Sequence, residues 1–314
     1  MRALVYERHG GVEELKLVKQ PDPELSPHRV LVGVHSIGLN PLDYRIRNGA
    51  LGPLAKLSKA RLTGSDFAGT VLEVGHRVRG VEVGDQVIGM TFQPLAGTSA
   101  ERITVNPKVL ARCPSNLDLS AAATVPLAAL TAYQALHHIG GIQPGQHVLV
   151  NGASGGVGTF ATQLAKSAGA EVTAVTSHRN TDWMNELGAD HTLDYEQVDC
   201  CRGDACYDIF FDCYGNRSFP KARQVLTRSG RYINTIPGPR AYKWTLANPL
   251  RRQTSHVVVV RSRRADLEAI CDLIEGDRLR PIVQQVYPLE QAQEAYRALE
   301  SKRTRGKLAI RIAR

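Results

Sequence analysis

The residues whose spacing points most clearly to chemistry form a glycine-rich stretch at 151–158, which reads NGASGGVG. Gly155 and Gly158 take the second and third glycine positions of the G-x-G-x-x-G pattern, and Ala153 takes the first. The middle glycine lets backbone N–H groups approach a pyrophosphate, and the last one lets the following helix pack closely on its strand. Taken alone, the stretch predicts either a dinucleotide-binding turn or merely a tight turn.

The sequence around this turn decides between the two interpretations. An apolar run at 148–150 precedes it, helix-forming residues at 159–168 follow it, and a second apolar run lies at 172–175. A strand, a glycine-rich turn, a helix and a second strand within about 30 residues are typical of a Rossmann domain. We therefore predict that the chain binds a dinucleotide.

The loop after the second strand indicates which nicotinamide cofactor is bound. An NAD site usually ends this strand with Asp or Glu, whose carboxylate holds the ribose 2′-hydroxyl. Here the loop reads Ser177-His178-Arg179-Asn180 and contains no carboxylate. A Ser hydroxyl and an Arg guanidinium suit a 2′-phosphate, which a carboxylate would repel. Unless they are ordinary loop residues, Ser177 and Arg179 predict NADPH rather than NADH.

The sequence contains no recognisable metal-binding pattern. Its six cysteines include no Cys-x2-Cys pair, and no His-Glu-x-x-His occurs. His137 and His138 are adjacent and are not spaced as a ligand pair. We predict that no metal is bound and that the cysteines are free thiols in a reducing compartment.

Composition limits the class of protein. A length of 314 residues with 43% hydrophobic and 22% charged residues predicts two globular domains and excludes a disordered chain. No run approaches the ~20 apolar residues of a membrane span, and the N-terminus lacks a secretory signal, so we expect a cytoplasmic protein. The net charge of +9 is concentrated after residue 216, where there are 21 basic and 8 acidic residues. That segment could serve an anionic cofactor, a nucleic acid or solubility alone.

Two kinds of lobe must position these residues. Before residue 118, short β-rich runs alternate with turn signals, which indicates an irregular, mainly β lobe. A helix is then predicted over 121–138, after which apolar runs and helical patterns alternate. This alternation predicts an α/β fold with a doubly wound parallel sheet. We expect the last segment to return to the first lobe, so one predicted domain comprises residues 1–120 and 256–314, and the other comprises residues 121–255.

Several motifs follow one another in an order typical of a known superfamily. They are Gly64-Ser65-Asp66-Phe67-Ala68-Gly69, Val83-Gly84-Asp85, Pro126-Leu127-Ala128-Ala129-Leu130-Thr131-Ala132, residues 151–158, Gly188-Ala189-Asp190 with Asp194-Tyr195, Phe211-Asp212 with Gly215-Asn216, and Gly306-Lys307. Across essentially the whole chain, the sequence resembles the zinc-independent quinone oxidoreductases, the ζ-crystallin group of the medium-chain dehydrogenase/reductase superfamily. The resemblance implies a Rossmann domain inserted in a GroES-like catalytic domain, a nicotinamide-bearing cleft between the two, and a homodimer.

The resemblance also implies roles for single residues. Those expected to bind the cofactor are Ser154, Gly155, Gly156 and Val157 at the pyrophosphate, Ser177, Arg179 and Tyr195 at the 2′-phosphate end, Thr131 near the nicotinamide, and Gly158 and Gly215 in the same site. Asn40 is also expected near the nicotinamide. It stands where the zinc-dependent branch has a cysteine ligand, and Ser65-Asp66 stand where that branch has His-Glu, so no catalytic zinc is implied.

The missing groups indicate the reaction class. Reducing a simple ketone puts a full negative charge on oxygen, which needs a metal or a positioned acid. The sequence offers no recognisable metal site and no Tyr-x3-Lys pair. We therefore predict NADPH-dependent hydride transfer to a quinone or an α,β-unsaturated carbonyl, in which the charge is delocalised. Asn40 and Tyr44 are the candidate catalytic residues; the proton comes from water or from Tyr44, unless Tyr44 only packs.

Two other functions stay open at this point. An enoyl-thioester reductase would deliver the same hydride to a β-carbon. A binding module would sense NADPH with the Rossmann lobe and bind RNA or a protein with the basic C-terminal third, although nucleic acid is not the favoured partner. Turnover of a simple quinone separates the enzyme from the sensor.

Overall fold

The computed structural model describes residues 1–50, 61–91 and 97–313. The chain divides into two compact units. The first unit comprises Met1–Ala128, Ser262–Gly276 and Pro281–Arg314, and the second comprises Ala129–Arg261 and Asp277–Arg280. The chain therefore leaves the first unit, builds most of the second and returns.

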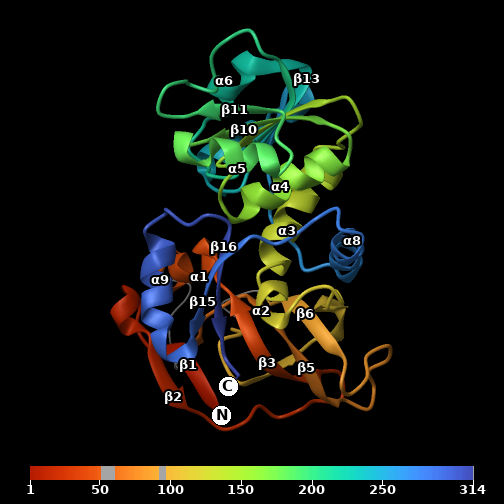
Figure 1. The fold of residues 1–314 in the computed structure, drawn as a ribbon, viewed down its shortest axis with the longest axis vertical. Coiled ribbons are helices and arrows are strands. Elements are labelled where there is room, and N and C mark those ends of the chain that lie inside the picture. The colour runs from red at the N-terminus through yellow and green to blue at the C-terminus, as the bar shows by residue number, and fades with distance from the viewer. Residues whose placement is uncertain (51–60, 92–96, 314) are drawn as a thin grey trace. The chain divides into compact units, whose positions relative to one another are not determined.

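The first unit is mainly β, as the runs before residue 118 predict. Its larger sheet has the order β15-β16-β3-β5-β6-β8, and β7 pairs with β3. Figure 1 labels β15, β16, β3, β5 and β6 of this sheet. The C-terminal strand β16 lies antiparallel to β3, with Ala309 opposite Gly38. The strands of this sheet are β3 (Val30–Gly38), β5 (Asp66–Val74), β6 (Gln86–Met90), β7 (Arg102–Val105), β8 (Leu110–Arg112), β15 (Val283–Pro288) and β16 (Lys307–Arg311).

Among the described residues, the first unit also contains a smaller sheet and several α-helices. The sheet has the order β2-β1-β4. Its strands are β1 (Arg2–Tyr6), β2 (Lys16–Lys19) and β4 (Arg61–Leu62), and the helices are α1 (Pro41–Arg47), α2 (Leu119–Ala122), α8 (Arg264–Glu275) and α9 (Ala292–Glu300). Helix α9 packs Ala295, Tyr296 and Leu299 into the same core as β1, β3 and β5.

The second unit contains the predicted parallel sheet, which confirms the fold class. The strand order is β11-β10-β9-β12-β13-β14, and every neighbouring pair is parallel. The central residues Val148, Leu149 and Val150 of β9 are completely buried, as a strand covered on both faces requires. The strands are β9 (His147–Asn151), β10 (Glu171–Thr176), β11 (His191–Asp194), β12 (Tyr207–Asp212), β13 (Leu226–Asn234) and β14 (Thr254–Val257).

The connections in this unit include helices α4 (Gly156–Ser167), α5 (Thr181–Glu186), α6 (Phe219–Ala222) and α7 (Pro239–Leu246). Strand β9 has β10 on one side and β12 on the other, so the strand order reverses there. Doubly wound sheets bind their ligands outside the carboxyl ends of the strands at such a reversal. Among the helices of the described residues, none is both long and apolar enough to cross a membrane.

The prediction of a single helix over 121–138 is wrong. The segment contains the end of α2, then helix α3 (Pro126–Tyr133), then a π-helix over Gln134–Ile139. Pro126 causes the first break, because proline has no N–H to donate and disfavours a helical residue before it. Asp118 starts α2 by accepting the N–H groups of Ser120 and Ala121.

The two pattern glycines of the turn after β9 have different surroundings. A Cβ atom on Gly158 would lie 2.2 Å from the carbonyl oxygen of Gly152 and 2.6 Å from the Cα of Ala153. A Cβ atom on Gly155 would meet only the Gly152 oxygen, at 3.4 Å. The backbone therefore excludes a side chain at position 158 and leaves space in front of position 155.

This difference gives a test of the turn. Gly158→Ala should lower the free energy of unfolding by about 1–3 kcal/mol, because helix α4 must shift to admit the methyl group. Gly155→Ala is the matched control and should stay close to the wild type. Urea denaturation followed by circular dichroism measures both, and equal losses in the two variants would contradict the packing described.

Candidate functional site

The predicted cofactor residues gather at the carboxyl edge of the parallel sheet in the second unit. The glycine-rich turn follows β9, and Ser177 and Arg179 follow β10. Tyr195 follows β11, and Gly215 lies three residues beyond the end of β12. Because parallel strands all end at one edge, four sequence segments that span about sixty residues meet there. The sequence motifs identified these residues, and the topology brings their segments together.

The glycine-rich turn fits a pyrophosphate. Helix α4 begins at Gly156 after an N-cap at Gly155, which supplies no capping side chain, and its first turn contains no acidic residue. Ser154, Gly155, Gly156 and Val157 are all half-exposed. The first N–H groups of a helix have no partner within it, and the helix dipole favours an anion there. The open space in front of Gly155 is therefore a suitable cradle for phosphate oxygens.

The loop after β10 offers donors of different exposure. Ser177 is buried, and its hydroxyl accepts a hydrogen bond from Asn180 Nδ2 at 3.3 Å. Arg179 is exposed, and Tyr195 is 52% exposed at the neighbouring strand end, where its N–H donates to the carbonyl of Thr176. A guanidinium, a phenol and a hydroxyl at adjacent strand ends are a donor set that suits a phosphate.

Asp212 is a positioning residue that the residue-by-residue prediction did not include. Its completely buried carboxylate accepts the amide of Asn151 at 2.7 Å and the N–H of Gly215 at 2.8 Å. The other oxygen accepts the N–H of Arg217 and the hydroxyl of Tyr232, both at 2.9 Å. This carboxylate ties the end of β9 to the loop after β12. The Phe211-Asp212 motif in the sequence could have identified this residue.

In the first unit, the amide of Asn40 is held between opposite charges. Asn40 is 2% exposed. Its Nδ2 donates to Asp66 Oδ2 at 2.9 Å, and its Oδ1 accepts from Lys307 Nζ at 2.5 Å. Lys307 Nζ also donates to the carbonyl of Leu39 at 2.8 Å and lies 3.8 Å from Asp66 Oδ2. Both ends of the Asn40 amide are therefore hydrogen-bonded to other protein groups.

A second carboxylate extends this network. Asn40 begins α1, where its N–H donates to Asp43 Oδ2, and the hydroxyl of Ser65 donates to Asp43 Oδ1, both at 2.8 Å. Burial raises the pKa of Asp43 to about 7, against the opposing effect of these two hydrogen bonds. Burial likewise raises the pKa of Asp66 to about 6, against the attraction of Lys307, whose own pKa burial lowers. We call Asn40, Asp43, Ser65, Asp66 and Lys307 the lysine network.

The lysine network does not fit a zinc ion. Structural and catalytic zinc sites use thiolate, imidazole or carboxylate ligands. Of these ligand types the network offers only two carboxylates, beside an amide and a hydroxyl. The Lys307 ammonium already supplies a positive charge between Asn40 and Asp66. A zinc ion placed there would meet that charge. Comparing Asn40 and Ser65-Asp66 with zinc-ligand positions did not identify Lys307, although the Gly306-Lys307 motif contains it.

The remaining predicted residues lie in different units. Tyr44 is half-buried on α1 and packs against the core of the first unit. Thr131 lies on α3 within the second unit and is 6% exposed. The catalytic roles of Asn40 and Tyr44 and the nicotinamide contact of Thr131 stay predictions.

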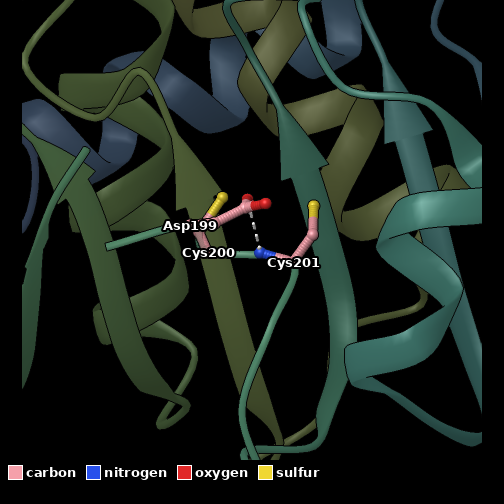
Figure 2. Close-up of side chains that lie close together, drawn as sticks. All are labelled: Asp199, Cys200 and Cys201. Atoms are coloured by element: carbon pink, nitrogen blue, oxygen red, sulfur yellow. Dashed lines mark hydrogen bonds between the residues drawn. The ribbon is translucent and has the colours of Figure 1, made fainter. Parts of the chain in front are cut away.

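A separate group of side chains of metal-ligand type lies in the second unit. Figure 2 shows Asp199, Cys200 and Cys201, whose ligand atoms lie within 4.8 Å of one another. The carboxylate accepts the N–H of Cys201 at 3.2 Å and pairs with the guanidinium of Arg217 at 3.3 Å. Both thiols are 2% exposed and belong to an apolar core. All six cysteines are free, as the sequence predicts.

Comparisons with known proteins agree with this architecture. Residues 26–121 match the alcohol dehydrogenase GroES-like domain, and residues 187–310 match the family described as zinc-binding dehydrogenase. A chloroplast envelope quinone oxidoreductase homolog of Arabidopsis thaliana is 30% identical over 99% of this chain and 98% of its own length. The human mitochondrial NAD(P)H oxidoreductase RTN4IP1 is 28% identical over 99% of this chain and 89% of its own length.

Solved structures extend the likeness to three dimensions. The quinone oxidoreductase from Coxiella burnetii superposes with a TM-score of 0.92 at 30% identity, covering 100% of this chain and 99% of that one. The relatives and the family names together imply an oxidoreductase that uses a nicotinamide cofactor. The chain therefore belongs to the quinone oxidoreductase branch of the medium-chain dehydrogenase/reductase superfamily.

Proposed function

We propose that this protein is an NADPH-dependent reductase of quinones or α,β-unsaturated carbonyls that works without zinc, as a cytoplasmic homodimer. The homodimer and the compartment rest on the sequence alone. The quinone oxidoreductase relatives support the substrate class. The observation that carries the zinc-free mechanism is the lysine network, in which a buried ammonium lies between the carboxylate of Asp66 and the amide of Asn40.

The reaction class follows from what the network can do. The chemistry that a reduced nicotinamide supplies when bound is hydride transfer. A saturated ketone that accepts a hydride becomes an alkoxide, whose charge needs a metal or a preorganised donor. The amide of Asn40 is already hydrogen-bonded to Lys307 and Asp66. The chain then contributes orientation and exclusion of water, which suffice for an acceptor that delocalises the new charge.

The cofactor preference is supported by the carboxyl edge of the second unit's sheet. The loop at 177–180 contains no carboxylate, and Arg179 and Tyr195 are exposed beside it. In our proposal these residues bind the ribose 2′-phosphate, while the turn from Ser154 to Val157 holds the pyrophosphate. Tyr44 or a water molecule supplies the proton that the substrate takes up after the hydride.

Lys307→Met should lower the free energy of unfolding by about 3–5 kcal/mol, because it leaves buried carboxylates without their cation. The pKa values of Asp66 and Asp43, about 6 and about 7, lie above their ordinary range. Their contribution to the stability of the folded protein is therefore lost as the pH rises through those values. The loss in the variant should therefore be larger at pH 8 than at pH 5. Denaturant titration at both pH values measures it.

Two controls accompany this prediction. Lys108→Met removes an exposed lysine of the same unit and should change stability little at either pH. The double variant Asp66→Asn/Lys307→Met should recover part of the loss, since one buried charge disappears with its partner. A loss that is independent of pH and unaffected by the second substitution would count against the network.

NADPH should bind at least about tenfold tighter than NADH, a difference of about 1.4 kcal/mol, which one charged hydrogen bond can supply. Arg179→Ala should weaken NADPH binding selectively. Arg202→Ala, an exposed arginine elsewhere in the second unit, is the matched control. Fluorescence titration with both cofactors is the measurement, and equal affinities in the wild type would refute the preference.

A quinone or a conjugated enone should be reduced about 10²- to 10³-fold faster, in kcat/KM, than the saturated ketone of similar size. The reason is that the amide and the ammonium of the lysine network are already bound to protein partners and are not offered to an oxyanion. NADPH oxidation at saturating cofactor measures the rates, and exhaustive chelation should leave them unchanged. A faster saturated ketone would overturn the mechanism, and NADPH binding without any turnover would favour the sensor.

A further inference from the structure

Part of the basic charge of the C-terminal third gathers at one cavity of the second unit. Residues 213–261 contain ten Lys or Arg residues and no Asp or Glu. Four exposed arginines of this segment line a cavity of about 390 Å³, and we call them the arginine pocket: Arg223, Arg228, Arg251 and Arg252. Like charges repel one another, so a bound anion would stabilise this arrangement.

Two segments of the chain form the arginine pocket at the amino edge of the parallel sheet. Arg223 lies three residues before the start of β13, and Arg251 and Arg252 lie just before β14, the neighbouring parallel strand. Gln253 Nε2 joins the segments by donating to the carbonyl oxygens of Arg223 and Thr227, both at 3.1 Å. Hydrogen bonds that no sequence motif announces therefore hold the two sides of the pocket together.

Arg228 reaches the same cavity from an irregular part of β13. Tyr207 of β12 pairs with Leu226, whereas Ile209 pairs with Arg231. A single residue of β12 thus lies opposite four residues of β13, at 227–230. Such a bulge bends the strand and re-aims its side chains. The bulge accounts for an arginine of β13 that lines a cavity beside the start of β14.

Aromatic rings position the guanidinium of Arg251. Its Cζ lies 4.7 Å from the centroid of the Trp244 ring and 5.9 Å from the centroid of the Phe219 ring. A guanidinium over an aromatic face keeps its N–H groups in its own plane, where they are available to an anion. Phe219 is 2% exposed and also lines the cavity, so the core of the unit anchors this arginine.

The guanidinium groups of the arginine pocket have no polar protein partner. Within the described part of the chain, none of the four donates a hydrogen bond to a protein atom or forms an ion pair with a carboxylate. Other arginines of the unit differ, because Arg217 pairs with Asp199 at 3.3 Å and Arg231 donates to the carbonyl of Ile139 at 3.0 Å. The donors of the pocket are therefore available to a ligand.

We propose that the arginine pocket binds a small anion with two or more linked phosphate groups, such as a diphosphate or a triphosphate. Guanidinium groups hold phosphate oxygens through paired N–H donors. Linked phosphates concentrate several negative charges in a small volume, as four gathered cations require, whereas nucleic acid spreads its charges along a backbone. The proposed cofactor site uses the loops at the carboxyl edge of the sheet, so this anion site is separate from it.

Full-length protein is titrated with sodium triphosphate by calorimetry, in a Gly155→Asp background. The added carboxylate repels phosphates from the glycine-rich turn, which could otherwise bind the probe. We expect one triphosphate per chain in this background. Arg228→Gln and Arg251→Gln should each weaken binding at least about tenfold, because each removes charged hydrogen bonds. Orthophosphate should bind more weakly than triphosphate, since it meets fewer of the four arginines.

Two controls separate the pocket from the general positive field. Arg240→Gln removes an exposed arginine of the same unit that does not line the cavity, and it should leave the affinity unchanged. Arg251→Lys keeps the charge but loses the planar fork, so its affinity should lie between those of the wild type and Arg251→Gln. Circular dichroism establishes that the variants fold, and Arg228→Gln changes an exposed side chain in a bulge.

Three outcomes would overturn the assignment. The first is that the Gly155→Asp protein binds no triphosphate. The second is that Arg228→Gln and Arg251→Gln both keep full affinity, or that Arg240→Gln loses as much as they do. The third is that a short single-stranded RNA binds more tightly than triphosphate and that the same two substitutions abolish this binding, which would identify a nucleic-acid surface instead.

Discussion

The ion pair between Lys307 and Asp66 is the interaction on which the first unit depends. Both side chains are almost completely buried, and burying a charge costs several kcal/mol unless a partner and hydrogen bonds offset it. The ammonium reaches Asn40 across a separation of 267 residues, which ties β16 to the end of β3. Asp66 also accepts the N–H of Leu127 at 2.9 Å, so the start of α3 is joined to the same charges.

This constraint shapes the chemistry available to the protein. A carboxylate pair that could have served a metal is instead neutralised by a lysine from the C-terminal strand, and the amide of Asn40 is fixed between the two. Within this network, the one ammonium, that of Lys307, already contacts Asn40 and Asp66. Under the proposed mechanism, the substrate itself accommodates the negative charge that a hydride brings, as quinones and enones do by delocalisation.

In the second unit, the direction of the strands decides which residues lie together at each edge of the sheet. Six parallel strands place every following loop at one edge, and this edge receives the glycine-rich turn, the loop with Ser177 and Arg179, and the loop that Asp212 holds. The same parallelism places the first residues of the strands together at the opposite edge. There Glu171 lies within ion-pair distance of both His147 and His191, although no motif joins these residues in the sequence.

The sequence by itself determined the fold class and the cofactor turn, because both depend on local patterns. The run from β9 to β10 and the spacing of Gly155 and Gly158 are contained in about thirty residues, and short-range sterics fix them. The break in the predicted helix at 121–138 also had a local cause, Pro126, whose effect the apolar pattern concealed. What only the tertiary structure decided are contacts between residues far apart in the chain. Lys307 meets Asn40 because an antiparallel register pairs β16 with β3, and no sequence pattern encodes such a register over 267 residues.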